Sequence, residues 1–387
     1  MSTTRPAFWD APATAAILAA LPGARAVGGA VRDTLAGQLV QDVDIGAPMV
    51  PEEIARRLRA AGAKVFETGI AHGTVTAVLH GVPHEVTALR RDIATDGRHA
   101  EVEWTTDWRE DAGRRDFTIN AMSMGPDGAL FDYFGGAADL AAGRVVFVGD
   151  ATTRIAEDYL RILRFFRFFA RYGRGAPDAD ALTAIRAGVP GMVRLSVERV
   201  WMELKRLLAG PRAAEAVARM AEAGVLAAVL PEAGAPDALA RMDAADPVLL
   251  LGALLQPGAD ITALSRRLKL SGTEAATLAA LQGLVPAGDD DALRRALAEA
   301  RHEVLLARIA LAQARDGVDR AALRDRLRAL PRPVFPLQGR DGLSLGGQPG
   351  PALGAALAAT RDWWLARGCT DDSEACRGEL TRVLSQG

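Results

Sequence analysis

The character of the sequence changes near residue 152, and this change restricts the folds that the chain can adopt. Before it, short β-rich runs alternate with helical segments, at 25–27, 43–45, 75–79, 84–89 and 144–148. After it, Ala/Leu/Arg-rich segments with helical periodicity continue to the C-terminus with almost no β-branched runs. The sequence therefore predicts an α+β protein, with a mixed-sheet head over residues 1–150 followed by an all-helical remainder.

The helical remainder contains clusters of glycine and proline that mark breaks between helices. With 387 residues the chain exceeds what one ordinary core accommodates, so several packed units are expected. We expect a helical neck over residues 151–210, a helical body over 211–330 and a helical tail over 331–387.

Charge and cysteine content narrow the class of protein. The net charge is −2, so any contact with nucleic acid should be local rather than spread over the whole surface. The two cysteines lie near the C-terminus, and no Cys/His cluster has zinc-site spacing. No segment has the roughly 18 uninterrupted apolar residues that a membrane span needs. A soluble, reduced, cytoplasmic protein without membrane contact is expected.

A glycine turn lies between the first β-rich run and a short helix that Gly37 can end. Gly28 and Gly29 allow backbone amides to approach a ligand closely, and a helix N-terminus favours phosphate. Arg32, in the first helical turn, can close on a triphosphate. Alone, such a turn is better explained by structure than by binding.

Paired carboxylates follow nine residues after Asp33, at Asp42 and Asp44. In a strand, positions i and i+2 share a face, so these side chains should point together and repel each other unless a cation neutralises them. Hard oxygen ligands suit Mg²⁺, which also contacts substrate phosphates. Glu85, on a later strand, can act as a third carboxylate, although an edge-strand glutamate is nearly as good an interpretation.

Two further segments combine arginine with acid. Arg115 and Asp116 begin a polar stretch that runs into a buried element ending near Asn120. Farther on, residues 157–169 predict an amphipathic helix whose face carries Arg161, Arg164 and Arg167. Glu157 and Asp158 stand at i,i+4 and i,i+3 spacing from Arg161, which is typical of a solvated helix surface with ion pairs. Beside a nucleotide, an acid and an arginine can instead present an acceptor and donors to a base edge.

Together these segments resemble the class II tRNA nucleotidyltransferase and bacterial poly(A) polymerase family of the DNA polymerase β superfamily. Five motifs occur in order within about the first 210 residues, at 28–33, 42–44, 114–121, 157–164 and 198–204. Beyond about residue 215 only helical character is visible, so body and tail are assigned by analogy.

The resemblance implies a role for each motif. Asp42 and Asp44 hold two catalytic Mg²⁺ ions with Glu85 nearby, and Gly28, Gly29 and Arg32 contact the triphosphate. The resemblance further implies that Arg115 and Asp116 contact the nucleotide, that residues 117–120 support the sugar pocket, and that 198–204 stiffens a helix. Asp158 and Arg161 recognise the base of CTP or ATP, and Arg164 and Arg167 extend that site. The substrates are ATP, CTP and tRNA, and the tail binds tRNA.

Within this family, the sequence favours CCA addition. Residues 67–76 resemble the CCA-adding branch, and no basic Gly-Arg-Arg-Phe-like stretch typical of poly(A) polymerases stands there. CC-adding and A-adding relatives differ in a flexible loop, which we place at residues 91–113. A non-catalytic RNA-binding protein or nucleotide sensor is the alternative from another class, and the intact Asp42, Asp44 and Arg115 argue against it.

Overall fold

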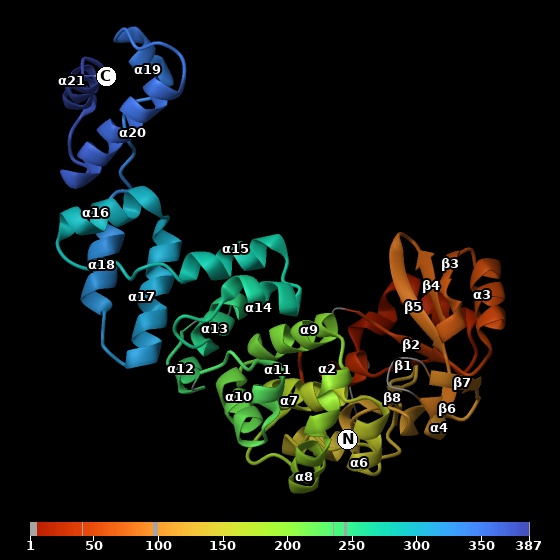
Figure 1. Ribbon diagram of the computed structural model, residues 1–387. Helices are drawn as coiled ribbons and strands as arrows, with labels where there is room; N and C mark the ends of the chain where they lie inside the picture. The colour runs from red at the N-terminus through yellow and green to blue at the C-terminus, as the bar shows by residue number, and fades with distance from the viewer. Residues whose placement is uncertain (1–5, 41, 96–99, 235, 244–245, 387) are drawn as a thin grey trace. The chain divides into compact units, whose positions relative to one another are not determined.

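The computed structural model describes residues 6–40, 42–95, 100–234, 236–243 and 246–386. It forms two compact units, Met1–Pro231 and Glu232–Gly387, which are coloured red to green and green to blue in Figure 1. The predicted class, a mixed-sheet head followed by helices, is confirmed. The finer division into neck, body and tail remains a prediction.

A seven-stranded sheet organises the first unit, in the order β3-β4-β5-β2-β1-β8-β9. Neighbouring strands are antiparallel except for β2 and β5, which are parallel. The strands are β1 (Arg25–Val27), β2 (Ile45–Ala47), β3 (Lys64–Gly69), β4 (Thr74–Leu79), β5 (Val82–Ala88), β8 (Ser123–Met124) and β9 (Leu130–Phe131). A separate antiparallel pair consists of β6 (Arg90–Thr95) and β7 (Ala100–Trp104).

Five short helices accompany these strands. They are α1 (Pro12–Ala20), α2 (Gly29–Leu35), α3 (Pro51–Ala60), α4 (Trp108–Gly113) and α5 (Gly136–Ala142). A Cβ atom on Gly46, in the fully buried β2, would stand 3.0 Å from the Trp108 ring and 3.1 Å from the Val27 side chain. This close approach places α4 against the centre of the sheet.

The predicted strands fit the structure unevenly. The run 25–27 is β1. The run 75–79 lies within β4, and the run 84–89 overlaps β5. The strand predicted at 43–45 is wrong, because β2 begins at Ile45 and the two aspartates precede it. The strand predicted at 144–148 is also wrong: this segment contributes only an isolated bridge between Phe117 and Phe147.

The predicted loop at 91–113 is built differently from the prediction. Its described parts are most of β6, then β7 and α4, so regular structure occupies much of a segment whose polar composition indicated a loop. Residues 96–99, within the predicted loop, lie outside the described residues.

Six helices complete the first unit, and α7 supplies much of its core. They are α6 (Ala151–Glu157), α7 (Leu160–Tyr172), α8 (Ala179–Gly188), α9 (Val197–Leu208), α10 (Ala213–Glu222) and α11 (Val225–Val229). Phe165 of α7 stacks on Phe147, and Phe168 meets Phe117 edge-on, so α7 is packed onto the segments that leave the sheet. Arg161, Arg164 and Arg167 of α7 stay half-buried on its other side, as the periodicity predicts.

The second unit is helical. Its helices are α12 (Asp237–Ala240), α13 (Pro247–Leu254), α14 (Ile261–Leu268), α15 (Gly272–Leu281), α16 (Asp290–Glu299), α17 (His302–Asp316), α18 (Ala321–Ala329), α19 (Gly339–Ser344), α20 (Pro351–Ala366) and α21 (Ser373–Leu384). Among the described residues, no helix combines the length and apolar character needed to cross a membrane.

Candidate active site

The glycine turn stands where β1 passes into α2. Gly28 has φ +62°, a conformation that side-chain-bearing residues rarely adopt, and a Cβ there would lie 3.1 Å from Nη1 of Arg115. The turn therefore requires glycine for its backbone and for the approach of Arg115. Gly37, with φ +67°, follows the end of α2 as predicted.

Two of the three predicted carboxylates, Asp44 just before β2 and Glu85 in β5, lie beside each other at neighbouring strands. Backbone N–H of Val27 donates to Asp44 O at 3.0 Å, so the chain runs beside β1 just before β2 begins. Ile45 pairs with Val86 in parallel register, which places Asp44 next to Glu85. These two residues line a cavity of about 210 Å³, here called the carboxylate cavity, whose wall also includes Asp111, Arg114 and Arg115.

The electrostatics of Asp44 reflect this crowding. Burial raises the pKa of Asp44, and the negative charges of Glu85 and Asp42 raise it further against the opposing charge of Arg115. Both other carboxylates are therefore near enough to repel Asp44. No ion pair engages Asp42, Asp44 or Glu85 within the described part of the chain.

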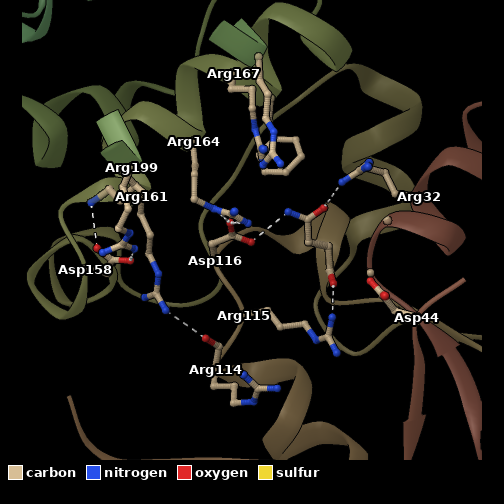
Figure 2. A pocket seen from close by; sticks show the side chains of 16 residues that line it. Arg32, Asp44, Arg114, Arg115, Asp116, Asp158, Arg161, Arg164, Arg167 and Arg199 are labelled. Atoms are coloured by element: carbon tan, nitrogen blue, oxygen red, sulfur yellow. Dashed lines mark hydrogen bonds and ion pairs between the residues drawn. The ribbon is translucent and has the colours of Figure 1, made fainter. Parts of the chain in front are cut away.

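A larger cavity of about 500 Å³, the main cavity, opens beside the glycine turn (Figure 2). Asp44, Asp116 and Asp158 line it, together with Gly28, Gly29, Asn120, Leu160 and Phe168. Its remaining lining residues are the arginines 32, 114, 115, 161, 164, 167, 199 and 206. Such an excess of guanidinium groups suits a polyanion such as a triphosphate.

Asn120 connects the two arginines nearest the glycine turn. Its side-chain oxygen accepts a hydrogen bond from Arg32 Nη1 at 2.6 Å, and its backbone oxygen accepts one from Arg115 Nη1 at 3.3 Å. Arg32 also lies over the rings of Phe168 and Tyr172, 5.0 Å and 4.7 Å from their centroids. Packing and hydrogen bonds thus orient both guanidinium groups beside the turn.

Asp116, which lines the main cavity, forms an ion pair with Arg164. Its Oδ2 accepts from Arg164 Nε at 2.6 Å, and its Oδ1 accepts from Asn120 Nδ2 at 3.0 Å. Burial would raise the pKa of Asp116, but the Arg164 charge and these hydrogen bonds outweigh it and the pKa lies below its usual range. Figure 2 shows the Asp116 carboxylate beside the guanidinium group of Arg164, which extends from α7.

The acid and arginine expected to face the base have different partners from those predicted. Residues 157–169 are not one helix, because Asp158 has extended backbone between α6 and α7. Asp158 Oδ2 accepts from Arg199 Nη2 at 2.6 Å, so its ion-pair partner lies on α9 and is not Arg161, the partner that the alternative of a solvated helix surface would give it. Arg161 does contact Glu157 as predicted and also donates to the backbone oxygen of Arg114 at 3.2 Å.

Glu203 of α9 is a buried acid that contacts two of the arginines lining the main cavity. It is buried and lies 3.1 Å from Arg167 Nε and 3.8 Å from Arg206 Nη1. Three arginines of the cavity wall, Arg164, Arg167 and Arg199, are therefore paired with carboxylates on other segments.

Comparisons with known proteins agree with this arrangement. Residues 24–146 match the family profile described as the poly A polymerase head domain, and residues 176–235 match a probable RNA and SrmB-binding site of polymerase A. The mitochondrial CCA tRNA nucleotidyltransferase 1 of Danio rerio is 39% identical over 380 residues, covering 94% of this chain and 87% of that protein. The chain belongs to the CCA tRNA nucleotidyltransferase family. This confirms the resemblance found in its motifs.

Other members of the CCA tRNA nucleotidyltransferase family are also similar. The CCA-adding enzyme of Geobacillus kaustophilus (strain HTA426) is 41% identical over 221 residues, which are 57% of this chain and 53% of that protein. The crystal structure of the Bacillus stearothermophilus CCA-adding enzyme in complex with CTP matches with a TM-score of 0.77 at 28% identity, covering 99% of both chains. The Thermotoga maritima enzyme complexed with tRNA shares the fold, with a TM-score of 0.65 at 21% identity over 94% of this chain and 91% of that one.

For this member of the CCA tRNA nucleotidyltransferase family, the structure brings nearly all predicted site residues together. Every predicted nucleotide-binding residue lines the main cavity, Asp44 lines both cavities, and Glu85 lines the carboxylate cavity. Asp42 is exposed and is not among the residues lining either one.

Several lining residues escaped the prediction. They are Arg114, Leu160, Phe168, Arg199 and Arg206. Arg199, Glu203 and Arg206 recur at i, i+4 and i+7 of α9, which places them on one helix face. That spacing was a usable signal, but the motif containing it was interpreted only as a stiffening helix.

Proposed function

We propose that this chain adds C, C and A to the 3′ ends of tRNA, using CTP and ATP and releasing pyrophosphate. The observation that carries the proposal is the main cavity, because one space contains the glycine turn, a cluster of arginines and an acid with an adjacent arginine. Phosphates, a sugar and a base edge each find suitable partners there.

The triphosphate end lies at the glycine turn in this proposal. Arg32 and Arg115 flank Gly28 and are oriented by Asn120, so their donors converge on one place. Backbone amides at Gly28 and Gly29 approach the phosphates where a side chain would obstruct them. Of the residues 117–120, Asn120 lines the cavity and would lie near the sugar, while the buried Phe117 and Ile119 support it from the core.

The base end lies at Asp158 and Arg161. Arg199 occupies one position on Asp158 Oδ2, and a carboxylate has further lone pairs to accept from an amino group of cytosine or adenine. Arg161 is anchored by backbone oxygens of Arg154 and Arg114 and presents its remaining donors to the base. Arg164 and Arg167 extend this side of the site.

The carboxylates fit divalent cations. Asp42, Asp44 and Glu85 are hard oxygen donors, and burial together with repulsion from Glu85 and Asp42 raises the pKa of Asp44, an effect that a bound cation would oppose. No group of three His, Cys, Asp or Glu side chains within the described ranges is placed to hold a metal ion alone. Asp42 and Asp44 would therefore hold Mg²⁺ together with water and substrate phosphates, as this ion commonly requires.

The reaction proposed for this site is in-line attack of the RNA 3′-hydroxyl on the α-phosphorus of the nucleotide, with pyrophosphate as the leaving group. Two Mg²⁺ ions, when bound, would lower the pKa of the attacking hydroxyl and stabilise the charge on the leaving oxygens. The arginines around Gly28 hold the triphosphate in line, and Asp158 and Arg161 select the base. The helices after residue 210 would recognise tRNA by shape and backbone contacts.

The test uses purified protein, Mg²⁺ and three tRNA substrates ending at the discriminator base, at C or at CC. With labelled CTP and ATP, we expect C on the first two, A on the third, and growth that stops at CCA. Growth by repeated A would instead identify a poly(A) polymerase, and addition restricted to C or to A would identify a CC-adding or A-adding enzyme. No growth of any end would favour a non-catalytic RNA-binding protein.

The cellular compartment is a separate question. The vertebrate relatives carry "mitochondrial" in their names, so a cytoplasmic location remains a prediction from composition. Fractionation of cells that express the chain at native level tests it.

A further inference from the structure

Asp111 is a buried carboxylate that the motifs did not single out. It lies on α4, only 2% of its surface is exposed, and it lines the carboxylate cavity. Its Oδ1 accepts from Arg114 Nε at 2.9 Å and Nη2 at 2.8 Å, and its Oδ2 accepts from Arg115 Nη2 at 3.0 Å. One side chain therefore holds two consecutive arginines of the main cavity.

The charge on Asp111 is stable in this position. Burial would raise the pKa of the carboxyl, but the charges of Arg115 and Arg114 outweigh burial and lower the pKa below its usual range. Buried charges persist where hydrogen bonds and opposite charges compensate them, and removing one partner leaves the others uncompensated.

Through Arg115, Asp111 acts on the triphosphate end of the site. The Arg115 guanidinium is held between the Asp111 carboxylate and the backbone oxygen of Asn120, and its Nη1 faces Gly28. Without the carboxylate, only the 3.3 Å hydrogen bond to Asn120 among these contacts would orient the group.

Through Arg114, Asp111 acts on the base end. The backbone oxygen of Arg114 accepts from Arg161 Nη2 at 3.2 Å, which Figure 2 shows as the link between the two segments. Arg114 is thus held at two points, by Asp111 through its side chain and by Arg161 through its backbone oxygen, so it connects Asp111 with Arg161.

A third contact connects Asp111 to the antiparallel pair. The backbone N–H of Arg90, the first residue of β6, donates to Asp111 Oδ1 at 3.3 Å. The same carboxylate therefore contacts Arg90, just before the segment 91–113, and the two arginines just after this segment, Arg114 and Arg115.

We propose that Asp111 is a positioning residue that sets the placement of Arg115 at the triphosphate and, through Arg114, of Arg161 at the base. This inference rests on the proposed function. It predicts that loss of the Asp111 charge changes both nucleotide affinity and base selection, although the side chain itself is placed behind the arginines and not against the nucleotide.

The test compares Asp111→Asn with Asp139→Asn. Asp139 is also buried, accepts from Arg144 Nη2 and from Thr118 Oγ1, each at 2.7 Å, and lines neither cavity, so it reports what loss of a buried, paired carboxylate charge does by itself. Kinetics on tRNA ending at C and at CC give KM and kcat for all four nucleoside triphosphates, and circular dichroism gives the melting temperature.

For Asp111→Asn we expect KM for CTP and ATP to rise at least about tenfold, with more incorporation of U and G, since small misplacements of positioning groups have large effects. Asp139→Asn should lower the melting temperature with KM and selectivity within about twofold of the parent. Unchanged KM and selectivity in Asp111→Asn, or the same changes in both variants, overturns the proposal.

Two further variants separate the inference from the proposed function. If Asp111 acts through Arg115, the KM of the double variant Asp111→Asn/Arg115→Lys should equal that of Arg115→Lys rather than the product of both effects. A change in Arg115→Lys without one in Asp111→Asn defeats only the role of Asp111, whereas no change in Arg115→Lys defeats the triphosphate assignment itself.

Arg114→Gln serves if Asp111→Asn fails to fold. It leaves the pair between Asp111 and Arg115 in place and releases the Arg114 side chain. We expect misincorporation to rise at least about threefold as the anchor of Arg161 loosens, and unchanged selectivity overturns the role proposed for Asp111 at the base end.

Discussion

Arg199 donates a hydrogen bond to Asp158 across 2.6 Å, from the first turn of α9 to the residue between α6 and α7. The second Asp158 oxygen accepts from the backbone N–H of Leu160 at 3.1 Å. The acid is therefore oriented by two segments, while Arg161 is held by others. Each group thus has another charged partner, Arg199 for Asp158 and Glu157 for Arg161, and a ligand in the main cavity would use the hydrogen-bonding positions that these contacts leave.

This arrangement leads to a prediction for base selection. Asp158→Ala and Arg161→Ala should remain folded, add C and A poorly and misincorporate proportionally more U or G, since each lost hydrogen-bond partner costs about 1 to 3 kcal/mol. Single-nucleotide incorporation of all four nucleoside triphosphates on tRNA ending at C or CC measures it. If these residues only stabilise the helix surface, rate and selectivity will both stay at parental values.

The carboxylates lead to a prediction for chemistry. Asp42→Ala or Asp44→Ala should abolish addition of both C and A while tRNA affinity stays nearly unchanged, because metal ions act on the reacting phosphate more than on docking. Glu85→Ala should lose less. Primer extension and a tRNA binding titration on the same preparations provide the two readouts, and near-normal turnover in either aspartate variant would refute the metal assignment.

Segment 91–113 leads to a prediction for the switch from adding C to adding A. If it resets the base pocket, shortening it within β6 and β7 should reduce A addition more than C addition, because the carboxylates and the glycine turn lie outside it. Rates on tRNA ending at C and at CC test this. Equal losses on both substrates would mean that the segment only supports the fold.

Asp116 leads to a prediction for stability against pH. Its pKa is lower in the folded protein than the ordinary value of 3.8, so it stabilises the fold above that value and the stabilisation is lost as pH falls through the folded pKa. Asp116→Asn should therefore cost roughly 3 to 5 kcal/mol near neutral pH, since it leaves Arg164 without its partner.

Thermal unfolding of both proteins from pH 7 down to pH 3 measures this effect. The difference between parent and Asp116→Asn should be constant from pH 7 to about pH 5 and should shrink below about pH 4. A difference that stays the same down to pH 3 would show that the Asp116 charge contributes nothing and that the variant acts through packing.

Much of the molecule could be predicted from the sequence because the relevant signals are local. The shift from β-rich runs to helical periodicity near residue 152 identified the fold class, and the alternation of arginine with apolar residues in 160–172 identified the two faces of α7. The glycine turn and the paired aspartates were recognisable because the spacing within each motif carries the chemistry.

Only the tertiary structure decided which acid meets which arginine. On a solvated helix surface Asp158 would pair with Arg161, three residues away, yet its partner is Arg199, 41 positions along the chain. Asp116 likewise meets Arg164 across 48 positions. Periodicity shows which face of an element is polar. The ion-pair partner of each acid depends instead on how separate elements pack. That packing is set by the burial of residues such as Phe117 and Phe165 in the core between the elements.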